Sequence, residues 1–480
     1  MERARKKIAI IGSGISGLVA AYEVNKYIQK EQLPFEILLL EKRLTPGGLI
    51  KTIETEDGFV DVGASSFDIR KSDIRPFLEE LGLLDQVQYS TGGKMDRFSG
   101  HEFINMDKPT YHGIPLQLKD IMHDKELSFK DKLAVIVNSS FNNMKRGTDP
   151  CITTEEFLEY RFCKEVSSLI AYPNYPENIY GSLELCPPQF FDSNLVELFE
   201  YSDSRMKMNP EELEFYMDGS GKEYTLKNGL SVLVSRLLQD VQSFIQTDKS
   251  VTEVTQIDQG IHLLKLNKNE ELRVGSLIST IPLSENYHLF SKRSGNDELI
   301  PKPVRAGMGT VLFQFPKGVI GRYPHGYGFV IPKRSSYHIS KAIFLNRKWP
   351  SFEHSEFDNL LIDIGRRQED TIIELPDETI LDFIEKELQE ILQLDGTYHY
   401  ARVYRWSNAI PHISIEERKN LIKNEAQFEK EFNSKGIFLG GNGLHGYGMK
   451  NAIREGQILA VKAIEYMKEK NNASIEATSL

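Results

Sequence analysis

The feature that most constrains this 480-residue chain is a glycine pattern directly after its first buried strand. Lys7 to Ile11 is short and β-branched, as in a buried parallel strand. The next six residues match G-x-G-x-x-G: Gly12, Ser13, Gly14, Ile15, Ser16 and Gly17. Gly12 permits a tight turn, Gly14 lets the backbone approach a pyrophosphate, and Gly17 lets a helix pack close to the strand. The helix N-terminus then offers free N–H groups to phosphate. The pattern predicts a dinucleotide-binding βαβ unit.

The second strand of this unit ends on an acid. Phe35 to Leu40 has the composition of a buried strand, and Glu41 stands where a carboxylate would bind a ribose hydroxyl pair and disfavour a 2′-phosphate. Gly47 and Gly48 follow closely after Pro46. Flavoenzymes of the amine-oxidase and glutathione-reductase type carry a glycine pair here, whereas NAD dehydrogenases usually do not. The spacing therefore favours FAD over NAD, and the alternative is a glycine-rich turn in another α/β fold.

A second glycine-bearing junction lies near the C-terminus. Gly436 to Leu439 is predicted to be a strand, and a helix to about Lys468 follows after a short loop. The glycines of this segment are Gly440, Gly441, Gly443, Gly446 and Gly448. Gly446 and Gly448 leave room for an isoalloxazine ring, and the helix N-terminus would stabilise negative charge at its N1–C2 edge. Because the two junctions lie at opposite ends of the sequence, we expect discontinuous domains.

Charge and cysteine content exclude several classes of protein. The formal net charge of −11 argues against a nucleic-acid partner, because phosphate contacts need a basic face. Cys151, Cys163 and Cys186 show no C-x-x-C spacing and no nearby His cluster, so neither a disulfide framework nor a metal site is expected. The apolar run from Ile8 to Ala21 resembles a signal peptide, but its glycines and the strand after it contradict that interpretation. No other stretch approaches the roughly 20 apolar residues of a membrane span. We expect a cytoplasmic protein without an integral membrane segment.

Several further segments carry a resemblance to a known family. They are Lys30–Pro34, Gly58–Phe67 followed by Arg70 and Lys71, Leu277–Pro282, Gly328–Ile331, Arg347–Pro350, and Arg405–Trp406 with Pro411. Together with the two glycine motifs they resemble the protoporphyrinogen/coproporphyrinogen oxidase family, most closely its soluble bacterial branch, within the FAD-dependent amine-oxidase superfamily. The similarity extends over nearly the whole chain.

The resemblance implies an α/β fold with three parts. A Rossmann-like FAD-binding domain of the amine-oxidase/glutathione-reductase type is expected over 1–75, 222–284 and 405–470. A helical and irregular subdomain is expected over 76–221, and a substrate-binding mixed sheet over 285–404. Residues 471–480 are expected to be a disordered tail.

The resemblance also implies an activity. Such an enzyme dehydrogenates a porphyrinogen to the porphyrin in heme biosynthesis, with molecular oxygen as acceptor and hydrogen peroxide as product. The flavin carries the hydride step, so no catalytic side chain is assigned. Coproporphyrinogen III and protoporphyrinogen IX both remain open as substrates. Transient contact with the next heme-pathway enzyme is a further expectation. Leu49, Ala64 and Lys450 depart from the family pattern and leave substrate identity open.

Site residues follow from matching this sequence to the family. The expected cofactor-binding residues are Gly12, Ser13, Gly14, Ile15, Ser16, Gly17, Glu41, Lys42, Gly47, Gly48, Leu49, Gly63, Ala64, Ser65, Val254, Trp406, Gly441, Gly448 and Met449. Arg70, Lys71 and Tyr175 are expected to bind substrate, the first two through its carboxylates. Amine-oxidising relatives have a lysine where Thr310 stands, which counts against an amine substrate. The alternatives are an oxidase or desaturase acting on an amine or isoprenoid, and a flavin-free binding protein of the same fold.

Overall fold

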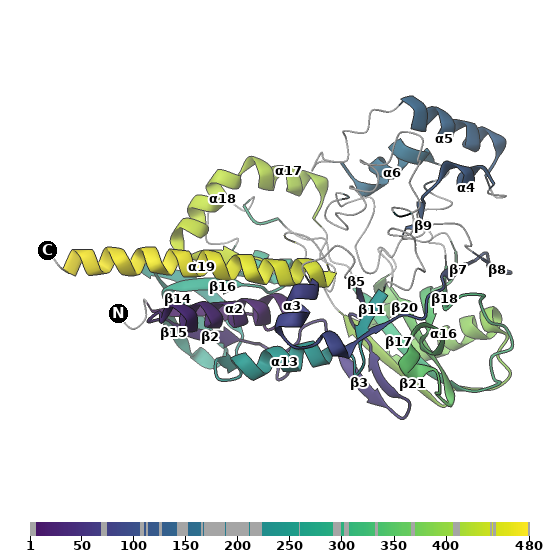
Figure 1. The fold of residues 1–480 in the computed structure, drawn as a ribbon, viewed down its shortest axis with the longest axis horizontal. Coiled ribbons are helices and arrows are strands. Elements are labelled where there is room, and N and C mark those ends of the chain that lie inside the picture. Colours follow the sequence, from purple (N-terminus) through teal and green to yellow (C-terminus); the bar gives the residue numbers. More distant parts are fainter. Residues whose placement is uncertain are drawn as a thin grey trace.

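The computed structural model shows two sheet-centred parts and a smaller helical part (Figure 1). The residues it describes are 6–68, 74–105, 110–111, 114–123, 127–141, 152–164, 223–258, 260–290, 299–301, 307–331, 335–365, 370–406, 413–441 and 448–478, with the single residues 167, 188, 211 and 444. Within these ranges, no helix is both long enough and apolar enough to cross a bilayer.

The first part is built on a five-stranded parallel sheet. Its strands, in spatial order, are β12 (Ile245–Gln246), β2 (Glu36–Leu40), β1 (Lys7–Ile11), β16 (Ser276–Ser279) and β22 (Ile437–Leu439). All neighbours pair in parallel, so the carboxyl ends of the strands share one edge of the sheet. Buried β-branched and leucine residues form these strands, as expected for a sheet covered on both faces. The predicted Rossmann-like α/β fold is confirmed.

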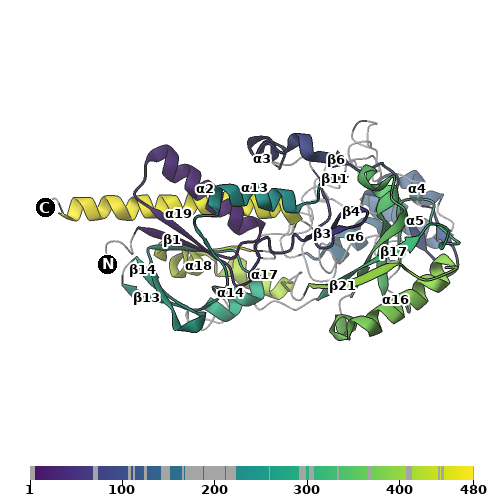
Figure 2. The same cartoon turned by 90° about the horizontal axis from the view of Figure 1, so that it is seen from below.

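Helices cover one face of this sheet and a small antiparallel sheet covers the other. Helix α2 (Ile15–Glu31) packs between α19 (Gly448–Thr478) and α13 (Ser231–Val241), as Figures 1 and 2 show. The opposite face contacts β14 (Ile261–Leu266) and β15 (Glu271–Val274), and β13 (Val251–Asp258) pairs with β14 in the same small sheet. Helix α19 continues to Thr478 and so includes most of the segment 471–480 that is expected to be a disordered tail. No glycine or proline stands between Gly456 and Thr478 to end the helix.

The second part is a seven-stranded mixed sheet, reached through the hairpin of β3 (Thr52–Thr55) and β4 (Gly58–Asp61). Its strands, in spatial order, are β21 (Tyr400–Trp406), β17 (Met308–Pro316), β20 (Phe357–Ile364), β19 (Ile339–Phe344), β18 (Gly328–Val330), β7 (Met95–Phe98) and β8 (Phe103–Ile104). Helix α16 (Asp377–Leu392) buries one face of this sheet (Figure 2).

The remaining elements connect these parts. They are β5 (Phe67–Asp68), α3 (Ile74–Glu80), β6 (Val87–Tyr89), β9 (Thr110–Tyr111), β10 (Ile114–Pro115), α4 (Leu118–Met122), α5 (Phe129–Phe141), α6 (Thr154–Phe162), β11 (Glu223–Leu226), α14 (Leu283–Phe290), α15 (Leu345–Lys348), α17 (Ile415–Lys423) and α18 (Glu425–Glu431). The segment 76–221, expected to be helical and irregular, contributes β7 and β8 to the mixed sheet. These strands are only four and two residues long, too short to show a period in the sequence.

Candidate active site

A cavity of about 480 Å³ lies at the edge where the carboxyl ends of the parallel strands meet. In open α/β sheets this edge is where ligands bind, at the point where strand order reverses. The reversal here falls at β1, because β2 lies on one side of it and β16 on the other. The first residues beyond these three strands, Gly12, Glu41 and Thr280, all line the cavity.

Each glycine of the first motif has a different environment. Gly12 adopts φ +95°, a region that L side chains rarely occupy. A Cβ added at Gly17 would lie 1.9 Å from the Gly12 carbonyl oxygen, so Gly17 is needed for packing between helix and strand. Gly14 has an ordinary extended conformation (φ −67°, ψ 179°), and an added Cβ there would meet no protein atom closer than 4.0 Å. The open space in front of Gly14 belongs to the cavity, which that residue lines.

The glycine pair after the second strand is joined to this first loop. The Gly47 N–H donates to the Ser13 carbonyl oxygen at 2.9 Å. Gly48 adopts φ +63°, and an added Cβ would lie 2.9 Å from the Gly14 Cα. The two backbones therefore touch, and only glycine fits at that contact. This close approach forms one wall of the cavity.

Glu41 is a buried carboxylate, 6% exposed, held by backbone and hydroxyl donors. The Ser13 N–H and hydroxyl donate to its Oε2 at 2.9 and 2.5 Å. The Arg43 N–H donates to its Oε1 at 2.8 Å. Three donors fix the carboxylate at the end of β2, where the remaining lone pairs can accept from hydroxyl groups in the cavity.

The two glycine-bearing junctions meet, as the sequence predicted. An added Cβ at Gly456, in the third turn of α19, would lie 2.5 Å from the Ser16 carbonyl oxygen of α2. The Gly441 N–H donates to Glu455 Oε2 at 2.8 Å, which ties the loop after β22 to α19. The first residues of α19, Gly448 and Met449, line the cavity. The N-termini of α2 and α19 therefore both border it.

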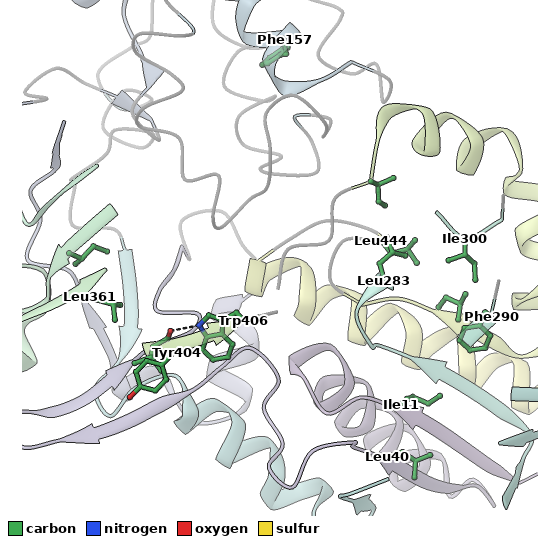
Figure 3. Close-up of a cluster of buried hydrophobic side chains, with 14 of the residues drawn as sticks. Ile11, Leu40, Phe157, Leu283, Phe290, Ile300, Leu361, Tyr404, Trp406 and Leu444 are labelled. Atoms are coloured by element: carbon green, nitrogen blue, oxygen red, sulfur yellow. Dashed lines mark hydrogen bonds between the residues drawn. The ribbon is translucent and has the colours of Figure 1, made fainter. Parts of the chain in front are cut away.

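The far end of the cavity is formed by β4 and the mixed sheet. An added Cβ at Gly63 would lie 2.1 Å from the Leu49 carbonyl oxygen and 3.0 Å from the Trp406 ring. The Trp406 indole N–H donates to the Val62 carbonyl oxygen at 3.2 Å, shown as the dashed line in Figure 3. Met308 of β17, paired with Trp406, also lines the cavity. The cavity thus ends against the first strands of the mixed sheet.

Asp61 fixes the turn that supports this end. It accepts hydrogen bonds from the Leu230 N–H (2.9 Å) and from the hydroxyls of Thr52 (2.5 Å) and Thr225 (3.2 Å). Burial raises the pKa of Asp61 to about 6, against the opposing effect of these donors. The carboxylate lies behind β4 and joins β3, β11 and α13.

Comparison with known proteins agrees with this geometry. The model of the family described as flavin containing amine oxidoreductase matches residues 15–464. The chain belongs to the flavin-containing amine oxidoreductase family. It is 22% identical over 481 residues to a coproporphyrinogen III oxidase of Bacillus subtilis (strain 168), across 97% of this chain and 100% of that protein. A protoporphyrinogen oxidase of Dictyostelium discoideum is 22% identical over 550 residues, across 97% and 100%.

Solved structures show the same family fold. A protein of Exiguobacterium sp. 255-15, provisionally described as a protoporphyrinogen oxidase, matches with a TM-score of 0.77 at 19% identity, over 95% of this chain and 98% of that one. Cyclohexylamine oxidase from Brevibacterium oxydans matches with a TM-score of 0.64 at 14% identity, over 97% and 100%.

Most residues predicted to bind the cofactor line the cavity. They are Gly12, Ser13, Gly14, Ile15, Ser16, Glu41, Lys42, Gly47, Gly48, Leu49, Gly63, Ala64, Trp406, Gly448 and Met449. Four others do not line it: Gly17, Ser65, Val254 and Gly441. Gly17 and Gly441 act through packing and loop geometry, while the Val254 side chain is buried in the core on β13. Arg70, Lys71 and Tyr175 lie outside the residues that the structure describes.

Sequence reasoning missed part of the lining. The missed residues include Arg43, Lys249, Ser250, Val251, Thr280, Ile281, Pro282, Glu285, Met308, Asn451 and Glu455. Val251, at the start of β13, lines the cavity instead of the predicted Val254. Thr280 could have been predicted, because it directly follows a buried strand that pairs with β1. In the structure its hydroxyl donates to the Ile11 carbonyl oxygen at 3.0 Å.

Proposed function

We propose that this protein binds FAD and uses it to oxidise a porphyrinogen, coproporphyrinogen III or protoporphyrinogen IX, to the porphyrin with oxygen as acceptor. The observation that carries the proposal is similarity over the full length, 97% of this chain and 100% of the relative, to a coproporphyrinogen III oxidase. The reaction would release hydrogen peroxide and would belong to heme biosynthesis.

The residues around the cavity fit FAD. At Gly14 and Gly48 the backbone borders the cavity without a side chain, and an added Cβ would occupy space beside the loop of Gly12 to Gly17. Two helix N-termini border the same cavity and favour negative charge. A buried carboxylate, Glu41, faces it at the end of β2 and would accept from ribose hydroxyls. These three features match the pyrophosphate, the reduced flavin edge and the adenosine sugar.

The bound flavin would supply the two-electron oxidation. Gly12 to Ser16 would hold the pyrophosphate with backbone N–H groups, and Glu41 would hold the ribose. Gly448 and Met449, at the start of α19, would place the helix dipole against the ring. Trp406 and Gly63 would close the far end and exclude water. Arg70, Lys71 and Tyr175 stay predicted substrate-binding residues.

The identity of the substrate class rests on two further observations. Thr310 stands where amine-oxidising relatives carry a lysine, which counts against an amine. The likeness to cyclohexylamine oxidase, at 14% identity, speaks for the fold alone. No residue singled out in the sequence supports an isoprenoid substrate.

The test is anaerobic reduction of the purified yellow protein. Coproporphyrinogen III, protoporphyrinogen IX and a panel of primary amines are mixed with it, and loss of flavin absorbance is followed. We expect rapid bleaching by a porphyrinogen, and porphyrin fluorescence with catalase-sensitive peroxide when air is admitted. Bleaching by an amine alone, or protein purified without flavin absorbance even after incubation with FAD, would contradict the proposal.

A further inference from the structure

A row of side chains crosses the inner face of the mixed sheet, next to the cavity. Strand register aligns its members, which are Tyr404, Thr310, Asp363, Lys341, Val330 and Arg97. The opposite face carries residues such as Val311 and Phe313, which are buried against α16. Met308 precedes Thr310 by two residues, so it lies on the same face about 7 Å along the strand. Since Met308 lines the cavity, the row begins one step from its wall.

The centre of the row is polar although it is buried. Lys341 Nζ lies 2.5 Å from Asp363 Oδ2, with side-chain exposures of 15% and 9%. Thr310 is 1% exposed, and its hydroxyl has no hydrogen-bond partner among the described residues. On the same face, Leu361 and Ile343 are buried apolar neighbours. A buried hydroxyl without a partner is unfavourable, so its place beside an ion pair calls for a ligand.

A second ion pair lies within electrostatic reach of Lys341. Lys348 Nζ contacts Glu223, and the Tyr327 hydroxyl donates to Glu223 Oε1 at 3.1 Å. Burial raises the pKa of Glu223, but the charge and hydrogen bond of Lys348, the Tyr327 hydroxyl and the charge of Lys341 together lower it to about 2. Lys341 is therefore balanced by acids on both sides. Because the centre of the row carries no net positive charge, it would bind N–H groups of a ligand better than it would bind a ligand carboxylate.

We propose that Asp363, oriented by Lys341 and assisted by the Thr310 hydroxyl, accepts hydrogen bonds from the pyrrole N–H groups of a porphyrinogen on this face of the sheet. The inference rests on the proposed function, because it assumes that this face is the substrate wall. Asp363 fixes the orientation of the macrocycle, and the apolar neighbours Leu361 and Ile343 contact its pyrrole rings. Asp363 would determine substrate specificity, and it has no role in the proposed binding of the flavin.

The test compares the full-length holoprotein with three variants. Asp363→Asn replaces one carboxylate oxygen with an N–H donor, and Thr310→Val removes only the unpartnered hydroxyl. The matched control is Asp358→Asn, on the same strand but facing α16, where Asp358 is 5% exposed and paired with Lys317 at 2.6 Å. Flavin content and thermal unfolding report folding. Steady-state oxidation of coproporphyrinogen III reports turnover. Anaerobic binding of coproporphyrinogen III to the dithionite-reduced holoprotein, followed by quenching of protein fluorescence, requires no turnover and reports binding.

We expect Asp363→Asn to weaken coproporphyrinogen III binding and to lower kcat/KM by about tenfold to a hundredfold, with flavin content unchanged. Thr310→Val should move both readouts in the same direction by a smaller factor, and Asp358→Asn should move neither. Equal binding and turnover in wild type and Asp363→Asn would overturn the inference. Wild-type binding without turnover, weakened by Asp363→Asn, would support the inference and refute the proposed oxidation. Neither binding nor turnover in the wild type would overturn both.

Discussion

The two glycines Gly14 and Gly17, three residues apart in one motif, should respond in opposite ways to alanine. Gly14 has dihedral angles that alanine adopts freely, and its new Cβ would meet no protein atom closer than 4.0 Å. Gly→Ala at a compatible position stabilises by about 0.4–1 kcal/mol, chiefly by restricting the unfolded chain. Gly14 is also the N-cap of α2, where glycine is preferred to alanine, so the two effects offset each other and the flavin-free protein should be about as stable as wild type. The added methyl group fills space beside the glycine loop, so FAD affinity should fall at least tenfold, about 1.4 kcal/mol.

Gly17→Ala perturbs packing within the protein instead. Its Cβ would lie 1.9 Å from the Gly12 carbonyl oxygen and 2.7 Å from Thr280 Oγ1. The first atom belongs to backbone, which cannot rotate away, so we take the upper end of the overpacking penalty, about 3 kcal/mol. The better helix propensity of alanine returns about 1 kcal/mol. A net loss of about 2 kcal/mol should appear with or without flavin.

Two measurements separate these effects. Thermal or urea unfolding of the flavin-free variants gives the stability difference, and the flavin-to-protein ratio after gel filtration at increasing FAD concentration gives affinity. If Gly14→Ala keeps wild-type affinity, the space in front of Gly14 is not where the pyrophosphate lies. If both variants lose the same stability without flavin, the assignment of different roles to the two glycines is refuted.

Three further outcomes are expected. Burial raises the pKa of Asp61 to about 6 from 3.8, so its contribution to the free energy of unfolding is greatest below pH 4. As the pH rises through 6 the free energy of unfolding should fall by about 3 kcal/mol. In Asp61→Asn, the free energy measured by urea unfolding should no longer show this fall. Glu41→Gln weakens charge-assisted bonds from Ser13 and Arg43 and should lower FAD affinity about tenfold, measured by titration of flavin fluorescence. Trp406→Phe removes the bond to the Val62 carbonyl and should lower the free energy of unfolding by about 1–2 kcal/mol in the same urea assay.

Signals that are local in sequence predicted the parallel-sheet part well. The strand predicted from Lys7 to Ile11 has those bounds in the structure, and the predicted helix after it runs from Ile15 to Glu31. Apolar composition, a glycine motif and a terminal acid all lie within about forty residues there, so each supports the others. The meeting of the two junctions was predictable because parallel strands place their carboxyl ends at one edge.

The mixed sheet was harder to predict because its order depends on distant partners. β7 and β8 join β18 at the sheet edge although more than two hundred residues separate them in the sequence. Strands of two to four residues carry no readable period, so tertiary pairing decides their state. The same limit applies to β13: Val251, which opens the strand, lines the cavity, whereas Val254 does not, and the boundary of a strand is poorly marked in its sequence.

Hydrogen bonds join the mixed sheet to the cavity-lining part of the chain at two points, and they determine how rigidly the polar row is held beside the cavity. The Trp406 indole is bonded to Val62 next to Gly63, which lines the cavity. At the other end of the same hairpin, Asp57 accepts from Asn359 Nδ2 at 2.7 Å and from the Ser355 hydroxyl. Asn359 is on β20, the strand that carries Asp363. Since these side-chain hydrogen bonds hold β20 to the hairpin whose far end borders the cavity, they fix the position of Asp363 relative to the cavity. This is the condition for a residue that orients a substrate against a flavin.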